Sequence, residues 1–376
     1  MLNGEQKNAL SPELISSSLL SQSLDCLSLE QEVYVIHDGS DIRKPHAKKM
    51  ESLTKVKDLS GNWVNGYNTF DSIAISDADQ KIHLLSCSPY SQGESHYNSM
   101  IGGYSEQEII KRHIQQVDKG FKERYQDKKI YHILDRKHDD ITCFETIDDL
   151  ESFLVIRLKL NRNSTQTYND ADEKERFLKL KDKPFAHQFE KQFDKFFYKN
   201  TLHTQCKASF SYEPFILNDR NYWVVKVIMV DRKGTNIFNN PMIIITNEPV
   251  TSDETAYKIF KIYLKRSKIE NVFKFLKEAL GWEEFQVQHF LAIQNIISLA
   301  FYVGAYFYEI QSDIVKNYQF KIICQLAKCK GKFTRHFFLE GLVILAHVAL
   351  FEQYVKENNL SPNDIEQLMK MIPQTS

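Results

Sequence analysis

The sequence predicts an α/β fold in which helices flank a mixed sheet, followed by a β-rich segment and a helical C-terminal region. Two observations lead to this prediction. Runs of β-branched and aromatic residues, separated by polar turns, fill residues 33–87 and return at residues 208–247. Apolar residues recur at three- and four-residue spacings over residues 106–125 and again after residue 251. The first pattern is typical of strands, and the second of amphipathic helices.

The chain has 376 residues, with 48 Lys and Arg against 49 Asp and Glu, so its formal net charge is −1. This balance excludes proteins that depend on a strong field of one sign, such as basic nucleic-acid coats and acidic tails, but it leaves room for a locally basic site. The hydrophobic share of 42% can build a large core. Dispersed cysteines and a start without a signal peptide lead us to expect a cytoplasmic protein.

The first 160 residues alternate strands and helices. Residues 1–32 are rich in Ser and Leu and are expected to form a short N-terminal segment with one or two helices. The sheet begins with a β-branched run at residues 33–38 that stops at Gly39, so its last residue is Asp38. Two further strands, at residues 63–75 and 81–87, complete an antiparallel meander. They are followed by a helix at residues 106–125, a strand at residues 129–135 that ends on Asp135, a short helix at residues 146–152 and a strand at residues 153–160.

Residues 161–250 are expected to form a β-rich insertion. In its first part phenylalanines recur mostly at four-residue steps, which predicts partly helical structure over residues 161–200; they are Phe177, Phe185, Phe189, Phe193 and Phe196. Strands are predicted at residues 208–217, 222–230 and 242–246, because apolar runs there are separated by Asn- and Asp-rich turns.

From residue 251 the pattern is helical, divided into segments 251–312 and 313–376, and the first helix covers about residues 253–280. Residues 290–308 are nineteen uncharged positions, a length close to that of a membrane span. Polar residues interrupt them, so we predict a buried amphipathic helix and no membrane partner. Residues 337–351 predict a further core helix.

The helix predicted near residues 253–280 carries the most informative pattern. At 100° per residue, Tyr263, Arg266, Glu270 and Lys277 share an arc of about 60°, and Lys274 joins them. A carboxylate among cations suits a site that holds a divalent ion and guides phosphates, because the acid binds the ion and the cations bind phosphate oxygens. The same spacing also fits a solvated helix face with i,i+4 ion pairs, which would contribute little stability.

Two further acids favour the metal site. Asp38 and Asp135 each close an apolar strand, and both strands are expected near the centre of one sheet, so their carboxylates can emerge side by side. Convergent acids of this kind hold the pairs of ions that stabilise the attacking and leaving oxygens of phosphoryl displacement. Taken singly, each of these acids is more often an ordinary strand-end or turn residue, and it is their joint pattern that favours the metal site.

The segment Tyr263-x2-Arg266-x3-Glu270-x6-Lys277 resembles the Y-R-E-K signature of DDE transposases of bacterial insertion sequences, whose catalytic core is RNase H-like. His37-Asp38-Gly39-Ser40 and Leu134-Asp135-Arg136 resemble the first and second acidic motifs of that family. The resemblance covers about residues 33–310. It implies an RNase H-like domain formed by residues 33–160 and 251–312, interrupted by the β-rich insertion at residues 161–250.

The resemblance also implies the activity: cleavage and strand transfer at transposon ends, with Asp38, Asp135 and Glu270 as catalytic residues that bind two Mg²⁺ ions, for which Mn²⁺ can substitute. Its partners would be double-stranded DNA at the transposon ends and target DNA, bound by a homodimer in the nucleoid-associated cytoplasm. The expected DNA contacts are Tyr263, Arg266, Lys277, Lys274 and Arg136, with Trp223 or Trp282 as the platform for a flipped base. Core packing is the alternative role for each tryptophan, and a plain surface role for Arg136.

Only 37 residues precede Asp38, whereas members of this family usually carry a separate helical DNA-binding domain there. Two hypotheses therefore stay open. The chain is an active metal-dependent strand transferase, or it is a truncated, non-catalytic relative that acts as a dimerising inhibitor of full-length transposase or as a DNA-binding regulator.

Overall fold

The structure is a computed structural model that describes residues 10–29, 31–91, 105–169, 175–199, 201–312, 314–329 and 333–371. The chain divides into two compact units, Met1–Ala305 and Tyr306–Ser376. The first unit contains the sheet and the helices that cover it, and the second is helical.

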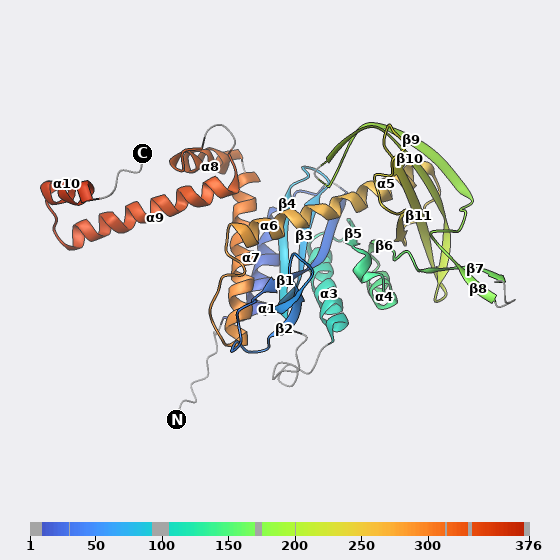
Figure 1. Ribbon diagram of the computed structural model, residues 1–376, viewed down its shortest axis with the longest axis horizontal. Helices are drawn as coiled ribbons and strands as arrows, with labels where there is room; N and C mark the ends of the chain where they lie inside the picture. The colour runs from blue at the N-terminus through green and yellow to red at the C-terminus, as the bar shows by residue number, and fades with distance from the viewer. Residues whose placement is uncertain are drawn as a thin grey trace, which may run out of the picture. The chain divides into compact units, whose positions relative to one another are not determined.

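The first six strands form the mixed half of a ten-stranded sheet (Figure 1). They are β1 (Glu32–Arg43), β2 (Thr54–Lys57), β3 (Trp63–Ser76), β4 (Ile82–Tyr90), β5 (Lys129–Leu134) and β6 (Phe153–Arg157). β1, β5 and β6 are parallel neighbours, whereas β3 pairs antiparallel with both β1 and β4. The predicted meander is therefore confirmed, and the predicted α/β class with it.

β1 is longer than the sequence predicted. It was expected to end at Asp38, but it continues to Arg43 because its second half keeps pairing with β3, as far as Arg43 opposite Gly66. Its parallel partner β5 stops earlier, with Ile36 opposite Ile133. Asp38 therefore lies inside β1, two residues beyond the point where the pairing with β5 ends.

The β-rich part continues the same sheet. β12 (Met242–Thr246) pairs antiparallel with β6, and the order then runs through the long strands β11 (Arg220–Val230), β10 (Thr201–Leu217) and β9 (His187–Tyr198). A separate two-stranded sheet joins β7 (Asn163–Asn169) to β8 (Glu175–Lys179).

The prediction of partly helical structure over residues 161–200 was wrong within the described residues, because β7, β8 and β9 lie there. A four-residue spacing is close to one helical turn, but it is also twice the two-residue period of a strand. Phe185, Phe189 and Phe193 are therefore all compatible with strand alternation. Phe189 stacks on Phe210 of β10, with ring centroids 4.7 Å apart, which is a cross-strand contact.

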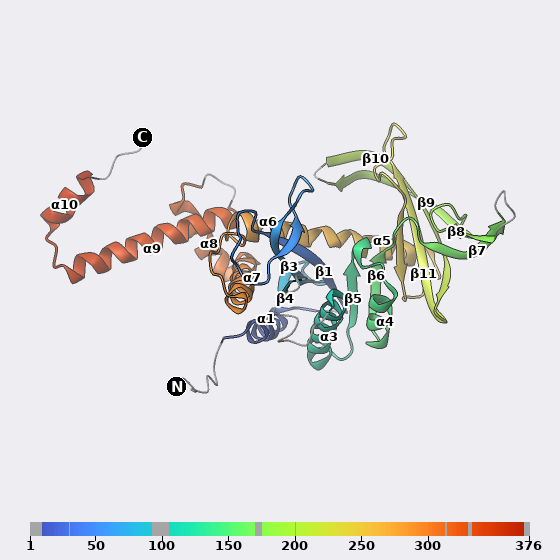
Figure 2. The ribbon, with the colours of Figure 1, turned by 60° about the horizontal axis from the view of Figure 1, so that its bottom comes forward.

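Helices cover both faces of the mixed half of the sheet (Figures 1 and 2). On one face lie α1 (Pro12–Cys26), α3 (Glu106–Arg124) and α4 (Ile141–Asp149), and on the other α5 (Asp253–Leu264) and α6 (Lys268–Glu278). Successive side chains of β1 point to opposite faces of the sheet. Val33 and Val35 point to the face of α1 and α3, because they belong to the core cluster of these helices. His37 shares their face, and Asp38 points to the face of α5 and α6.

Side-chain caps set several helix starts. Ser105 accepts a hydrogen bond from the Glu108 amide at the start of α3, and Ser252 accepts one from the Thr255 amide at the start of α5. α4 was predicted to begin at Thr146, but it begins at Ile141, because Asp140 caps it by accepting from the Thr142 amide. Its end at Asp149 is likewise earlier than predicted.

The long helix predicted at residues 253–280 is two helices joined by a 3₁₀ turn, Lys265–Ser267. α5 ends at Leu264 and α6 begins at Lys268. The tighter turn changes the phase between the two helices, so the 60° arc that assumed one regular helix does not describe this segment. Arg266 lies in the turn itself.

The remaining helices are α7 (Phe290–Ser312), α8 (Ile314–Leu326), α9 (Arg335–Glu357) and α10 (Pro362–Met371), which confirms the helical C-terminal region. The predicted burial of one face of α7 is also confirmed, because Phe290, Ile293, Ile297 and Phe301 are at most 5% exposed. By length and composition alone, α7 and α9 could each cross a membrane, and 44% and 11% of their most apolar windows are buried.

The prediction that residues 337–351 form a core helix was wrong. Although Phe338 and Gly341 of α9 are buried against its own unit, apolar side chains farther along are exposed, among them Val343, Val348 and Leu350. The composition of an apolar helix does not show whether another element packs against it. For this reason composition alone predicted the wrong burial for residues 337–351.

Candidate active site

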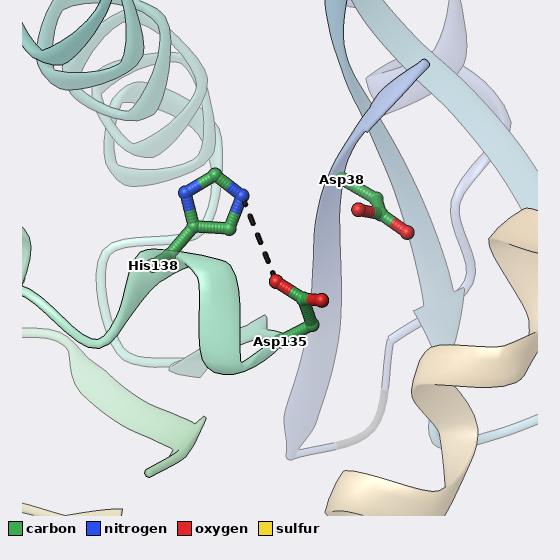
Figure 3. Close-up of side chains that lie close together, drawn as sticks. All are labelled: Asp38, Asp135 and His138. Atoms are coloured by element: carbon green, nitrogen blue, oxygen red, sulfur yellow. Dashed lines mark ion pairs between the residues drawn. The ribbon is translucent and has the colours of Figure 1, made fainter. Parts of the chain in front are cut away.

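Asp38 and Asp135 come together where β1 continues beyond the end of its parallel partner β5. Their carboxylates and the imidazole of His138 each offer a ligand atom within 4.8 Å of the others, and in the described part of the chain this is the cluster that could hold a metal ion (Figure 3). Asp38 is buried and Asp135 is half-buried. The convergence of the two predicted acids therefore follows from the parallel pairing of β1 with β5.

A 3₁₀ turn after β5 brings His138 back to the acids. Asp135 caps this turn, Arg136–His138, by accepting a hydrogen bond from the Lys137 amide at 2.8 Å. His138 Nε2 consequently lies 3.9 Å from Asp135 Oδ1 (Figure 3). Its ring is edge-on to Phe70. His138 is not among the site residues predicted from the sequence, although a histidine three residues after a proposed ligand is a signal that could have identified it.

Glu270 joins the site through Arg266. The guanidinium donates from Nη2 to Asp38 Oδ2 and from Nη1 to Glu270 Oε1, each at 2.6 Å, and so bridges the two carboxylates. The Glu270 side chain is 58% exposed, whereas that of Arg266 is 21% exposed. Glu270 is thus linked to Asp38 through the guanidinium of Arg266 and is not part of the cluster of Asp38, Asp135 and His138.

The electrostatics agree with a shared cation site. Burial would lower the pKa of Arg266, but Asp38, Asp135 and Glu270 together raise it. Burial raises the pKa of Asp38 to about 6, while Arg266 works in the opposite direction and Asp135 adds to the rise. All three predicted acids therefore act on one positive charge.

Burial lowers the pKa of His138 to about 4, although Asp135 opposes the change. The imidazole is therefore uncharged at neutral pH, which is the form that can bind a metal ion.

A second buried acid, Asp71, was also missed. It lies on β3 opposite Asp38 in the strand register and is fully buried. Thr69 Oγ1 donates to Asp71 Oδ2 at 2.5 Å, and burial raises the pKa of Asp71 to about 7 even though Cys87 and Thr69 lower it. An acid inside the apolar run of residues 63–75 was the available signal.

On the opposite face of β1, His37 belongs to a buried chain of hydrogen bonds. Its Nδ1 is bonded to Ser72 Oγ at 2.6 Å and its Nε2 to His132 Nδ1 at 2.8 Å. Ser72 is bonded onward to His113, and His132 to Asp118. These bonds tie β1 to β3, β5 and α3 directly beneath Asp38, so they fix the position of the strand that carries it.

The predicted DNA-contact residues differ in accessibility. Tyr263 is buried, its pKa is raised to about 12 by that burial, and Arg157 hydrogen-bonds to it. Lys277 is largely buried and donates to the Asp41 backbone carbonyl at 2.6 Å. By contrast, Lys274 is exposed next to Glu278, and Arg136 is exposed in the turn after Asp135.

The two candidate tryptophans have different surroundings. Trp282 is 1% exposed, donates from Nε1 to the Ile297 carbonyl and lies among Phe273 and Phe301, so the core role holds and the base-stacking alternative was wrong for it. Trp223 is partly exposed on β11, between Pro214 of β10 and Thr246 of β12. Its predicted contact with a flipped base stays a prediction.

The residues present fit a divalent cation. Carboxylate oxygens are hard ligands, a neutral imidazole nitrogen completes the donor set, and a guanidinium cation already lies between Asp38 and Glu270. Nε2 of His138 is buried and has no hydrogen-bond partner among the described residues, so a ligand atom is available there.

The strand order is β4-β3-β1-β5-β6, with antiparallel pairs at one side and parallel pairs at the other. Together with the acids on β1 and after β5, this order defines an RNase H-like domain with an acidic centre that could hold a cation. The family model for the transposase DDE domain matches residues 102–305, a segment that includes Asp135 and Glu270. The chain therefore belongs to the transposase DDE domain family. A comparison with curated proteins gave no match.

Proposed function

We propose that this transposase cleaves DNA at the ends of its element and transfers the strands in a Mg²⁺-dependent reaction. The observation that carries the proposal is the convergence of Asp38, Asp135 and Glu270 on Arg266 at the edge of an RNase H-like sheet. Membership of the transposase DDE domain family supports the same reaction class.

Asp38, Asp135 and Glu270 would hold two Mg²⁺ ions, or Mn²⁺ in their place. When bound, the ions supply Lewis-acid activation of the attacking water or 3′-hydroxyl and stabilise the leaving oxygen. The strand pairing of β1 with β5 fixes Asp38 relative to Asp135, and α6 supplies Glu270 from the other side. Asp135 is further fixed by its hydrogen bond from the Lys137 amide.

Arg266 has two tasks in this proposal. Without DNA its guanidinium neutralises Asp38 and Glu270 and keeps the carboxylates from repelling each other. With DNA it turns to a phosphate, because bidentate guanidinium donors suit phosphate oxygens as well as carboxylates, and this frees the acids for the ions.

DNA binding would be local rather than driven by net charge. Seven Lys or Arg residues but a single acid lie between residues 258 and 277. Lys274 and Arg136 are the accessible members of the predicted contact set, while Tyr263 and Lys277 act mainly by supporting the site, and Trp223 is the proposed base platform. Lys111, Lys137 and Lys159 line a cavity of about 210 Å³ beside His138 and add to the phosphate-binding surface.

We further propose that the active form is a homodimer on paired transposon ends, with target DNA as the second substrate, in the nucleoid-associated cytoplasm. The exposed apolar side chains of α9 support self-association, because such a face is costly to leave in water. The second copy of the chain is the occupant we propose for it.

The decisive experiment compares the wild-type chain with Glu270→Gln. The substrate is a set of duplex oligonucleotides that carry the sequences flanking the coding region, incubated with Mg²⁺ or Mn²⁺. We expect nicking by the wild-type protein and a loss of about 10³-fold or more in the variant, because ion-mediated stabilisation of the transition state contributes several kcal/mol.

Glu278→Gln is the matched control, since Glu278 lies on the same helix, is exposed and pairs with Lys274 at 3.9 Å. It should cleave at nearly the wild-type rate. Equal cleavage by wild type and Glu270→Gln would contradict the assigned site. Binding of the duplexes without cleavage by either protein would favour the alternative of a non-catalytic, dimerising regulator.

A further inference from the structure

We propose that His138 is a direct ligand of the ion held by Asp38 and Asp135, and that it makes this site prefer Mn²⁺ and similar transition-metal ions to Mg²⁺. The inference deepens the proposed function, because it rests on ion binding at the same acids. It concerns a residue outside the three-acid set, and it predicts a property, metal selectivity, that three carboxylates alone would not produce.

The possible ligand atoms of His138, Asp38 and Asp135 lie close enough to share one ion. A ring nitrogen of His138 and one oxygen from each of Asp38 and Asp135 lie within 4.8 Å of one another, so a single ion placed among them can reach all three after small side-chain movements (Figure 3). His138 Nε2 is 3.9 Å from Asp135 Oδ1, too far for a hydrogen bond. The gap therefore suits an ion better than it suits a direct bond.

A ring nitrogen of His138 is also free to bind an ion. His138 is 5% exposed, and its Nε2 has no hydrogen-bond partner in the part of the chain that the structure describes. Burying a polar atom without a partner is unfavourable. Coordination would satisfy this nitrogen, whereas ring packing on Phe70 would not.

The neighbouring histidines provide an internal comparison. His37 is bonded through both ring nitrogens, to Ser72 and His132. His113 is likewise bonded through both, to Ser72 and Ser88. Both belong to the structural network beneath Asp38, whereas His138 faces the acids with a nitrogen that this network does not use.

Selectivity follows from the donor type. Mg²⁺ prefers oxygen ligands and retains its waters. Imidazole is a softer ligand that suits first-row transition-metal ions better, with an affinity that is lowest for Mn²⁺ and highest for Cu²⁺. A site with two carboxylates and one imidazole therefore gains more for Mn²⁺ than for Mg²⁺. Removing the imidazole should leave an oxygen-only site with less discrimination.

The test uses the full-length protein and Mn²⁺ as the probe. Electron paramagnetic resonance of bound Mn²⁺ should show hyperfine coupling to an imidazole ¹⁴N in the wild type and in His46→Gln, a variant at an exposed histidine, but not in His138→Gln. Titration should show that His138→Gln weakens Mn²⁺ binding by at least about tenfold, the lower end of what loss of a residue supporting a metal site costs, and weakens Mg²⁺ binding less.

The measurement on the wild type does not depend on whether a variant folds. If Mn²⁺ binds the wild type in a manner abolished by Asp38→Asn but shows no imidazole coupling, the inference is wrong. An absence of Mn²⁺ binding to the wild type would also overturn it. Imidazole coupling without any DNA cleavage would support the ligand and contradict the proposed function, so the two failures are distinguishable.

Discussion

At the scale of single residues, the sequence indicated acids that follow apolar strands, and it missed polar residues whose role depends on a turn or on strand register. Asp135 was found because it ends a strand. His138 was missed because only the 3₁₀ turn after Asp135 returns its ring to the acids. Asp71 was missed because only the register with β1 brings it opposite Asp38.

Asp71 leads to a prediction about pH. Because burial raises its pKa to about 7, the folded chain holds a proton that the unfolded chain releases near pH 4, and the stability of the ion-free protein should fall as pH rises between these values. Asp71→Asn should remove this loss. We expect its advantage in unfolding free energy to be near zero at pH 4 and to reach about 2–4 kcal/mol above pH 7, measured by urea denaturation in EDTA.

Asp79→Asn is the contrasting control. Burial is the largest single influence and raises the pKa of Asp79, but hydrogen bonds from Ser76 and Lys81 together outweigh it and lower the pKa. This carboxylate therefore stabilises the fold above the unfolded pKa, and the benefit disappears as pH falls. Its replacement should therefore cost stability at pH 7. A pH-independent effect of Asp71→Asn would show that the buried carboxyl is not the titrating group.

At the scale of elements, the sequence predicted most strands and helices of the mixed sheet and also the strands β10, β11 and β12 of the β-rich part, but it did not predict β7, β8 and β9. Residues 106–125 had an unambiguous helical period, and α3 occupies nearly the same range. The phenylalanines near residues 185–193 had a spacing shared by helices and strands, and pairing with β10 decided between them. Asp140 and the 3₁₀ turn at Lys265–Ser267 changed boundaries that periodicity alone cannot locate.

The pairing of β1 with β3 provides a prediction at this scale. A Cβ at Gly66 would lie 2.2 Å from the Ile42 carbonyl oxygen and 2.5 Å from Val56 Cγ2, so Gly66→Ala must push the strands apart. We expect a loss of about 1–3 kcal/mol in unfolding free energy, the usual effect of overpacking, measured by urea or thermal denaturation.

Ser60→Ala, at an exposed position in the connection from β2 to β3, should change stability by less than about 0.5 kcal/mol. If Gly66→Ala were as stable as Ser60→Ala, the close approach of β1 to β3 at Ile42 would be wrong.

At the scale of the whole molecule, the near-zero net charge excluded a binder driven by charge alone, and the distribution of charge is more informative than its sum. Arg266 is already paired with Asp38 and Glu270, and Lys277 with Glu283 at 3.4 Å, so part of the basic segment is neutralised within the protein. The sequence showed where the cations are, but it could not show that Arg266 also faces Asp38, because that contact joins residues more than 200 positions apart.

The exposed face of α9 gives the prediction at this scale. Val343, Leu350 and Tyr354 lie along one side of the helix, and they are 47%, 62% and 53% exposed. If a second copy covers this side, Leu350→Glu should convert a dimer into a monomer in light scattering after size-exclusion chromatography, with unchanged helix content by circular dichroism.

Glu352→Gln, on the opposite side of α9, is the control and should remain dimeric. A monomeric wild type, or a Leu350→Glu variant that stays dimeric, would contradict this interface.

The distribution of the three acids along the chain has a consequence for synthesis. Asp38 and Asp135 are 135 − 38 = 97 residues apart, and Glu270 follows 270 − 135 = 135 residues later. The first two meet only when β1 has paired with β5, which follows β2, β3, β4 and α3 along the chain, and such a non-local step is intrinsically slow. A nascent chain therefore carries its first acid long before it can present the third, and the nuclease centre proposed here stays incomplete on the ribosome until α6 has emerged and docked on β1.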